Sequence, residues 1–247
     1  IYYGTGSSKI AFDGSGDIYL ISKSRKLIKF NSSGDLQFEQ MYPDKTLQAV
    51  AVSGTDLFIG GALQAGTTTF GSISLSSSGG YNTGFMVRAD LNGIYNGSMI
   101  AGGSVTGDGS AVSDIIIDNT GNLIITGGYT NNLILGSINI SSPAQSYYTF
   151  IAKCDNAFGF VWVSTSSSFA NPLRQMWTYR IFTDNLNNIY EYGLISSSFS
   201  FGSIPVNPDG GQFLVKFDPD GNPQESHSLQ NSAINRTYIT PSGKILT

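Results

Sequence analysis

The sequence is poor in charged residues, and histidine and cysteine are almost absent from it. Only 12% of the 247 residues are charged, and there is one histidine, His227, and one cysteine, Cys154. A single thiol excludes a disulfide framework, and one His with one Cys cannot build a zinc site of ordinary composition. A Ser-His-Asp arrangement would have to use His227, which stands in the polar segment ESHSL and is interpreted as an exposed loop residue.

Clusters of positive charge and long apolar runs are also lacking. The chain has 13 Lys and Arg against 17 Asp and Glu, and its basic residues gather only in the short stretch 23–29. Nucleic-acid binding is therefore not expected, because a phosphate backbone needs many clustered cations. No apolar run approaches the roughly 18 residues of a membrane span. No signal peptide is recognised, so any export signal is expected to lie outside these residues.

What the sequence has in quantity is Gly, Ser, Thr and Asn, arranged in an internal repeat. Three short phrases recur in a fixed order. The first, an apolar strand, a Gly/Asn turn and a second apolar strand, stands at 10–20, 50–61, 115–128, 181–193 and 238–247. The second, of the form FGSI, stands at 70–75, 135–140 and 201–206. The third, an apolar strand ending in Asp and a turn, stands at 84–93, 149–159 and 212–221, with a short counterpart at 26–34.

The phrases predict four antiparallel strands in each unit. Runs of Ile, Val, Phe and Tyr are bounded by turn residues, and many are apolar on both faces. Sheets that are buried on both faces are typical of a β-propeller, whose blades are arranged radially. We therefore predict an all-β propeller of four-stranded antiparallel blades, forming a single domain over 1–247 or a fragment of one. The blades are expected at about 9–46, 47–110, 111–173 and 174–229, with 1–8 and 230–247 as partial blades.

The repeat resembles a known family. Its pattern, Asp-x-x-Gly-Asn, a short apolar run and Thr-Gly, followed by a strand with Lys-x-Asp, is similar to that of the bacterial seven-bladed β-propeller repeat family. The matching residues are Asp118, Gly121, Asn122, Thr126 and Gly127, then Lys153 with Asp155 and Lys216 with Asp218. The opening IYYGTGSS resembles the outermost strand of that family, whereas Asn187-Asn188 departs from its Gly-Asn. The resemblance implies a bacterial surface or secreted protein without a defined activity.

Two segments superficially resemble calcium loops. They are residues 13–17 and 218–222, which are rich in Asp, Asn and Gly. Neither has the Glu that a calcium loop places downstream, and both fall where every repeat has a hairpin turn. We interpret them as turns, and we expect neither a metal nor a cofactor.

A ring of polar residues is predicted at one end of the central channel. The position before the apolar run of each inner strand is Lys9, Asp114, Arg180 or Arg236 in four of the five units, and Ala49 in the second. Rotation from blade to blade should bring these positions together, where charges of both signs attract. One interpretation is a ring that only keeps the channel wet, and the other is a docking site for a small polar ligand or for a side chain of a partner.

Two further features are candidates for the same site or for sugar binding. Glu191 stands in an otherwise apolar column of the repeat, which is costly unless the carboxylate is paired or near solvent. It can be an acid of the ring, or a structural Glu at a blade edge paired with an Arg or a Tyr. Tyr81, Tyr147 and Tyr148 fall in the predicted loop before the third strand, where they could stack on a sugar or belong to the core.

Two classes of function remain open from the sequence. The first is a non-catalytic, secreted or cell-surface module for adhesion or protein binding. The second is a glycan-specific protein, either a lectin or a glycan-cleaving enzyme that uses paired carboxylates. The near-absence of His and the placement of most acids in turns favour the first. The expected partners are a protein or a glycan at the cell surface, and the chain can be part of a larger protein or complex.

Overall fold

The computed structural model describes an all-β protein. The residues that it describes are 9–22, 25–77, 82–103, 108–143, 146–167, 177–194, 197–207, 211–229, 238–239 and 245–246. Within these ranges there are 24 strands and no helix. None of the described residues forms a long apolar helix of the kind that crosses a membrane.

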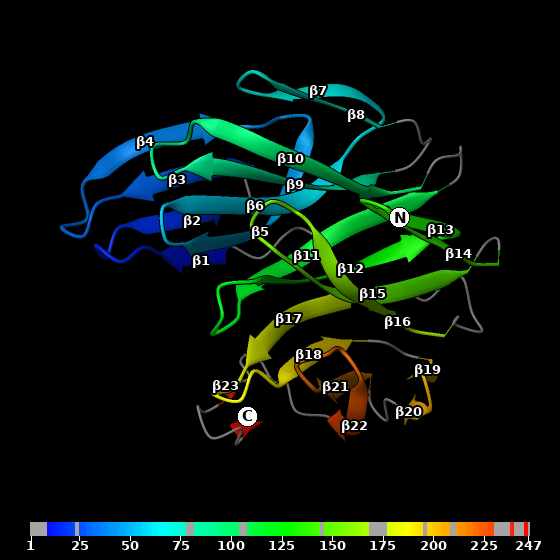
Figure 1. The fold of residues 1–247 in the computed structure, drawn as a ribbon. Helices are drawn as coiled ribbons and strands as arrows, with labels where there is room; N and C mark the ends of the chain where they lie inside the picture. The colour runs from blue at the N-terminus through cyan, green and yellow to red at the C-terminus, as the bar shows by residue number, and fades with distance from the viewer. Residues whose placement is uncertain are drawn as a thin grey trace.

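Four antiparallel sheets form the blades of the propeller, and each blade consists of four strands that are neighbours in its sheet (Figure 1). Blade 1 consists of β1 (Lys9–Phe12), β2 (Ile18–Ser22), β3 (Lys26–Phe30) and β4 (Leu36–Met41). Blade 2 consists of β5 (Lys45–Ser53), β6 (Asp56–Leu63), β9 (Thr83–Asp90) and β10 (Tyr95–Gly102). Blade 3 consists of β11 (Gly109–Ile117), β12 (Leu123–Thr130), β15 (Tyr147–Cys154) and β16 (Phe160–Thr165). Blade 4 consists of β17 (Trp177–Thr183), β18 (Ile189–Leu194), β21 (Gln212–Phe217) and β22 (Pro223–Leu229).

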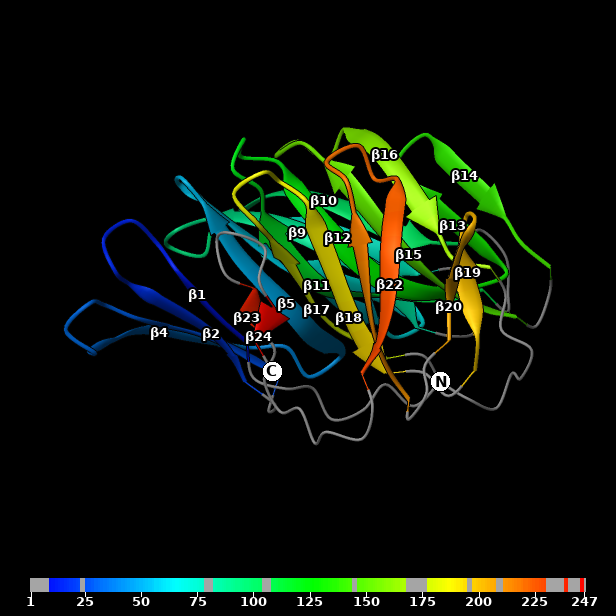
Figure 2. The same ribbon diagram turned by 90° about the horizontal axis from the view of Figure 1, so that it is seen from below.

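The first strands of successive blades lie side by side around the axis. β1 contacts β5, β5 contacts β11, β11 contacts β17, and β17 contacts β23 (Tyr238–Ile239), which pairs with β24 (Ile245–Leu246). Figure 2 shows the sheets of successive blades lying next to one another. The prediction that the strands beginning near Ile10, Val50, Ile115, Ile181 and Tyr238 are the innermost ones is therefore confirmed.

We call the face of a blade that is turned toward the preceding blade its leading face, and the opposite face its trailing face. Between neighbouring blades these faces bury each other. The trailing face of blade 1, with Tyr19 and Leu27, packs on the leading face of blade 2, with Leu57 and Val87. The interfaces between blades 2 and 3 and between blades 3 and 4 are apolar in the same way. Cys154 is fully buried in the second of these three interfaces, as expected of a small apolar residue.

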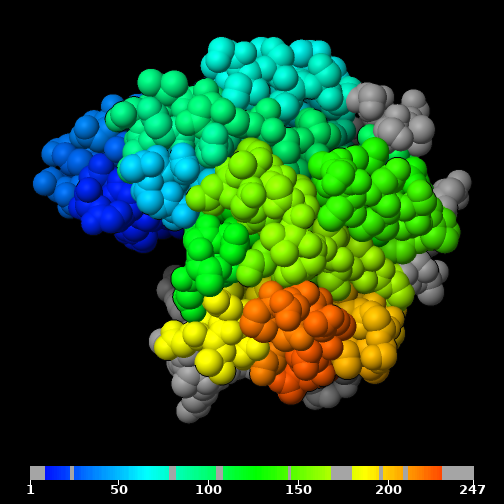
Figure 3. All heavy atoms as spheres, in the orientation of Figure 1, coloured from blue at the N-terminus to red at the C-terminus, as the bar shows by residue number. Residues whose placement is uncertain are grey.

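The FGSI phrases form β-hairpins, which the first unit lacks. They are β7 (Gly66–Phe70) with β8 (Ile73–Ser77), β13 (Asn132–Leu135) with β14 (Ile138–Ser141), and β19 (Phe199–Phe201) with β20 (Ile204–Val206). All three connect the second strand of a blade to its third, and so they leave the sheets at the same end. Figure 3 shows them on the outer rim.

Each hairpin reaches back to the preceding blade. β13 pairs with β10 of blade 2, which extends that sheet to six strands. Ser167 N–H at the end of blade 3 donates to the carbonyl of Ser200 in β19, with 2.7 Å between N and O. At the end of blade 1, the ring of Tyr42 lies 5.5 Å from that of Phe70 in β7. The hairpins therefore fasten blades 2, 3 and 4 to their predecessors.

The lysine and aspartate of the repeat motif meet in space. In blade 3, Lys153 Nζ lies 2.8 Å from Asp118 Oδ2. Asp118 Oδ1 also accepts hydrogen bonds from the backbone N–H groups of Thr120 and Asn122, which closes the turn. Burial by itself raises the pKa of Asp118, but Lys153 and these donors outweigh it and hold the pKa at about 2.

Replacing Lys153 with methionine should raise the pKa of Asp118 toward its ordinary value, because the opposite charge that favours the carboxylate is removed. A lowered pKa stabilises the fold above the pKa of the unfolded chain, and this contribution is lost as the pH falls toward 2. The variant should therefore have a smaller acid-dependent loss of stability. Side-chain carboxyl NMR titration of Asp118 measures the shift, and an unchanged titration curve would contradict the assignment.

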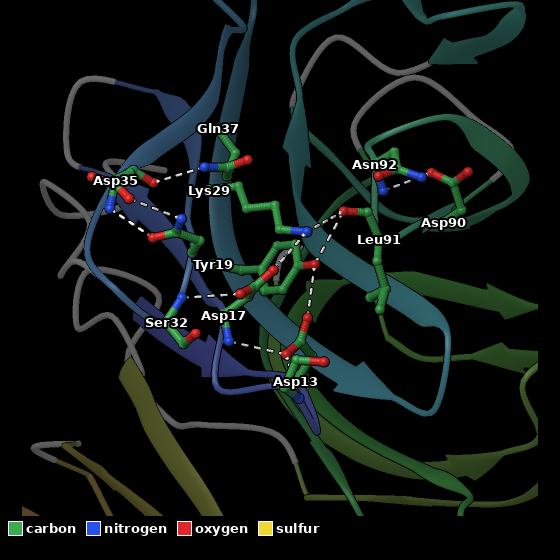
Figure 4. Close-up of polar contacts among 12 residues, drawn as sticks. Asp13, Asp17, Tyr19, Lys29, Ser32, Asp35, Gln37, Asp90, Leu91 and Asn92 are labelled. Atoms are coloured by element: carbon green, nitrogen blue, oxygen red, sulfur yellow. Dashed lines mark hydrogen bonds and ion pairs between the residues drawn. The ribbon is translucent and has the colours of Figure 1, made fainter.

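Blade 1 carries a variant of this arrangement (Figure 4). Lys29 Nζ forms an ion pair with Asp17 at 3.0 Å and donates to the carbonyl of Leu91, in the turn between β9 and β10. The buried hydroxyl of Tyr19 lies between Asp13 and the same carbonyl. The turns of blades 1 and 2 are thus tied together. The carboxylate of Asp13 accepts from the N–H groups of Ser15 and Asp17 and so closes the hairpin turn, as the sequence predicts, whereas that of Asp17 binds Lys29 and the N–H of Ser32. The described residues contain no cluster of metal-binding side chains.

Candidate functional site

Three of the inner strands, β5, β11 and β17, contain a bulge at the positions of the predicted ring. The register shifts at Leu47/Ala49 in β5, at Val112/Asp114 in β11 and at Thr178/Arg180 in β17. Opposite two of these bulges the second strand of the blade has a glycine, Gly61 or Gly127. A Cβ atom there would lie 1.9 Å from a carbonyl oxygen of the inner strand, so only glycine allows the two strands to approach so closely. Bulges re-aim the side chains that follow them. Asp114 and Arg180 each stand directly after one.

Asp114 ties three blades together. Its Oδ1 atom lies 2.7 Å from Lys9 Nζ of β1, and both side chains are about nine-tenths buried. Its Oδ2 atom accepts a hydrogen bond from the backbone N–H of Ile181 in β17, with 3.1 Å between N and O. The ion pair joins blade 1 to blade 3, past the short and buried side chain of Ala49 in blade 2. Charges of both signs therefore do meet at the inner strands.

The partner of Asp114 is Lys9 and not Arg180. The hydrogen bond from the N–H of Ile181 to Asp114 places Asp114 close to Arg180. The two residues lie within the distance of roughly 12 Å that two extended side chains can span in an ion pair. The side chain of Arg180 is nevertheless exposed. Arg236, the fourth member of the predicted ring, lies outside the described residues. The ring as a ligand site stays a prediction, and Arg180 is its one exposed member among the described residues.

Glu191 does not lie at a blade edge or at the surface. It is fully buried on the leading face of blade 4, and its Oε1 atom accepts hydrogen bonds from the hydroxyls of Thr126 (2.7 Å) and Thr149 (3.2 Å) of blade 3. Its Oε2 atom has no hydrogen-bond partner in the described part of the chain. Burial raises the pKa of Glu191 to about 7, and the two threonine hydroxyls oppose that rise. The expected Arg or Tyr partner is replaced by two threonines.

The placement of the tyrosines in a loop was wrong for the two that the structure describes. Tyr147 and Tyr148 belong to strand β15, because the hairpin β13–β14 takes up the insertion before them. Tyr148 is 5% exposed and stacks on Tyr129, with ring centroids 5.0 Å apart, and Tyr147 packs against the interface between blades 3 and 4. Tyr148 therefore offers no open ring face as a platform for a sugar. Tyr81 lies outside the described residues.

A groove on the outer rim, between blades 1 and 2, was not expected from the sequence. It has a volume of about 490 Å³. Its walls come from the end of β4, the turn of hairpin β7–β8 and the turn between β9 and β10; the lining residues are Gln40, Met41, Tyr42, Gly71, Ser72, Gly93, Ile94 and Tyr95. Met41 and Ile94 are 59% and 67% exposed, so the groove has apolar edges that face solvent.

Polar groups are set among these apolar edges. The hydroxyls of Tyr42 and Tyr95 form a hydrogen bond with each other, and Tyr42 donates to the amide oxygen of Gln40. The two rings pack on Phe70 of the hairpin and are less than 10% exposed. Burial raises the pKa of both tyrosines, so both are neutral in the physiological range. A repeat alignment gives no sign of this groove, because it depends on how blade 2 sits against blade 1.

Comparisons with known proteins add little. No family model matches the sequence, and no curated protein matches it. Among solved structures, a protein of unknown function from Bacteroides caccae is 9% identical with a TM-score of 0.39, covering 92% of this chain and 82% of that one. BamB from Moraxella catarrhalis is 10% identical with a TM-score of 0.34, covering 98% and 83%. Both TM-scores lie below 0.5, so neither likeness indicates a family or a function for this chain.

Proposed function

We propose that the protein is a non-catalytic interaction module, and that the rim groove between blades 1 and 2 binds an extended segment of another protein. The observation that carries the proposal is the pairing of solvent-exposed Met41 and Ile94 with a polar wall formed by Gln40 and the tyrosine hydroxyls. Apolar edges suit an apolar side chain of the segment, and the amide nitrogen of Gln40, whose oxygen accepts from Tyr42, can donate to its backbone.

A polypeptide fits this groove better than a glycan. Sugars are held mainly by stacking on open aromatic faces, and here the faces of Tyr42 and Tyr95 are covered by Phe70. Lectin activity at this groove would therefore have to rely on hydrogen bonds alone. The tyrosine hydroxyls already bond to each other, which leaves few groups for sugar hydroxyls.

The positions of the carboxylates support a non-catalytic role. A glycan-cleaving enzyme needs two carboxylates flanking a substrate at about 5–10 Å from each other. The carboxylate of Asp114 forms an ion pair with Lys9 and accepts a hydrogen bond from the N–H of Ile181, and the side chain of Glu191 is fully buried. Neither lines the rim groove. The location that we propose, secreted or at a bacterial cell surface in an adhesive role, draws its support from the low charge and from the resemblance of the repeat to a family of surface proteins.

Panning a phage-displayed peptide library on the purified protein tests the groove. Peptides with an apolar residue as an anchor should be enriched, and their binding should fall at least tenfold with Ile94→Asp or with Ser72→Trp, which fills the groove. Leu186→Asp is the matched control, because Leu186 is 77% exposed but lies in a turn of blade 4. Enriched peptides that bind all three variants equally, or specific binding on a glycan array in their place, would count against the proposal.

A further inference from the structure

The last strand of blade 2 and that of blade 3 each end in a backbone contact with the hairpin of the following unit. The end of β10 pairs with β13, with Gly102 opposite Ile134. At the end of β16, the N–H of Ser167 donates to the carbonyl of Ser200 in β19, and the bridge between these two segments is antiparallel as well. The last strand of a blade therefore accepts one more antiparallel strand on its outer edge.

Blade 1 has a proline at the corresponding position. The repeat aligns Pro43 with Gly102 and Ser167. Proline has no N–H to donate, and the carbonyl of Pro43 accepts a hydrogen bond from the side chain of Arg25. The hydrogen bond that ties the hairpin to blade 3 therefore has no donor in blade 1. Hairpin β7–β8 contacts blade 1 through the ring of Tyr42 instead.

The outer edge of β4 is left unpaired. Antiparallel pairing alternates between residues whose backbone groups face the neighbouring strand and residues whose groups face away from it. The N–H of Tyr42 donates to the carbonyl of Arg25, so the backbone groups of Gln40, two residues earlier, also face β3. Those of Met41 and Glu39 then face the outer edge. Within the described ranges β4 pairs with β3 alone, and an unpaired edge is a template for a further strand.

The rim groove lies at this edge. Its wall on the side of blade 1 consists of Gln40, Met41 and Tyr42, and Ile94 stands on the side of blade 2. We propose that a bound segment adds to blade 1 as a further strand, antiparallel to β4 and hydrogen-bonded to the backbone of Met41 and Glu39. The proposal rests on the peptide-binding function proposed above and specifies its mode, in which the backbone supplies affinity and alternate side chains supply selectivity.

The segment should have apolar residues at alternate positions. Side chains that stand opposite each other in a strand pair lie on the same face of the sheet. Tyr42 belongs to the trailing face of blade 1, so segment residues opposite Tyr42 and Gln40 point toward blade 2 and the groove. The residue between them bonds to Met41 and points away. Strand β19 has this pattern, Phe-Ser-Phe, with both phenylalanines buried.

A synthetic peptide with the sequence of residues 197–203 tests the proposal, because it contains the strand that this chain adds to blade 3. In a fluorescence polarisation titration up to about 1 mM, it should bind the 247-residue chain saturably. Met41→Pro should lower the affinity at least tenfold, since it removes an outward N–H. The pairing with β3 does not use that N–H, so thermal unfolding should stay close to that of the wild type. Met41→Ala keeps the N–H and should lower the affinity at most about threefold.

Methylation of single backbone nitrogens of the peptide reports the pairing directly. Only alternate N–H groups of an added strand face its neighbour. A methyl group on the nitrogen of Ser200 or Gly202 should lower the affinity at least tenfold, because these N–H groups face β4 when the phenylalanines face the groove. A methyl group on the nitrogen of Phe199 or Phe201 should change the affinity at most about threefold. Equal effects at all four nitrogens would contradict an added strand.

The remaining outcomes separate this inference from the proposed function. A peptide that does not bind up to about 1 mM overturns the added strand, whereas panning still tests the groove. Binding that Ile94→Asp abolishes but Met41→Pro leaves unchanged overturns the added strand and supports the groove. Ser98→Pro, on the last strand of blade 2, should bind like the wild type; a loss of binding in that variant in place of Met41→Pro would put the strand on β10 and overturn the inference.

Discussion

Replacing Glu191 with glutamine should remove most of the dependence of stability on pH between about pH 4.5 and 7. In the wild-type protein, full burial raises the pKa of Glu191 from 4.5 to about 7. Between these values the folded chain binds more protons than the unfolded chain, and so the free energy of unfolding falls as the pH rises through this window. Above pH 7 the loss is complete. A shift of this size corresponds to about 3 kcal/mol.

The substitution keeps the geometry and removes the titration. A glutamine oxygen can still accept from Thr126 and Thr149. Urea unfolding at pH 5 and pH 8 should give midpoints that differ clearly for the wild type and hardly at all for Glu191→Gln. Glu225→Gln, an exposed residue of β22, is the matched control and should behave like the wild type. Equal pH dependence in Glu191→Gln and the wild type would show that Glu191 is not buried as described.

Replacing Asp114 with alanine should lower the free energy of unfolding by about 3 kcal/mol. The change leaves the ammonium group of Lys9 buried beside an apolar side chain, and it takes the acceptor from the N–H of Ile181. Removing one partner of a buried ion pair is far more destabilising than the pair is stabilising. In a domain of this length the melting temperature should fall on the order of 10 °C, as differential scanning calorimetry would measure. Asp114 is thus unsuited as a neutral probe of ligand binding, and Arg180→Ala is the better choice.

A double variant distinguishes lost charge pairing from lost packing. Lys9→Met with Asp114→Asn removes both charges and keeps an acceptor for Ile181, so it should recover most of the stability that Asp114→Ala loses. Glu39→Ala, which breaks the exposed ion pair with Lys26, should cost less than about 1 kcal/mol. If the Asp114→Ala variant has the same melting temperature as the wild type, the ion pair does not hold blades 1 and 3 together.

The strands could be predicted from the sequence because each is set by its own residues. An apolar run such as Ile115–Ile117, a turn that begins at Asp118 and a second run from Leu123 predict the pairing that the structure has. The repeat then places the same strands in each unit, and the order of the units gives the order of the inner strands. The turns at 13–17 and 218–222 followed from the same local chemistry.

The contacts between blades could not be predicted in this way. That Asp114 pairs with Lys9, two blades away, depends on how far the inner strands rotate about the axis and on the bulge before Asp114. The same holds for Glu191, whose place in the column of the repeat was clear but whose threonine partners stand on another sheet. The tyrosines of β15 were misplaced because a four-residue strand, β14, and a short link fill the segment that was assigned to a loop.

The backward reach of the hairpins has a consequence for how the chain is made. Each hairpin belongs to a later unit and fastens to an earlier blade, as β13 does on β10 and β19 does at the end of β16. Synthesis proceeds from the N-terminus, so every new unit leaves the ribosome when its attachment point already exists. Blade 1, which is made before blades 2, 3 and 4, has no hairpin between its second and third strands. Assembly can thus proceed blade by blade in the direction of translation, and a force that pulls on the C-terminal end would detach the blades in the reverse order.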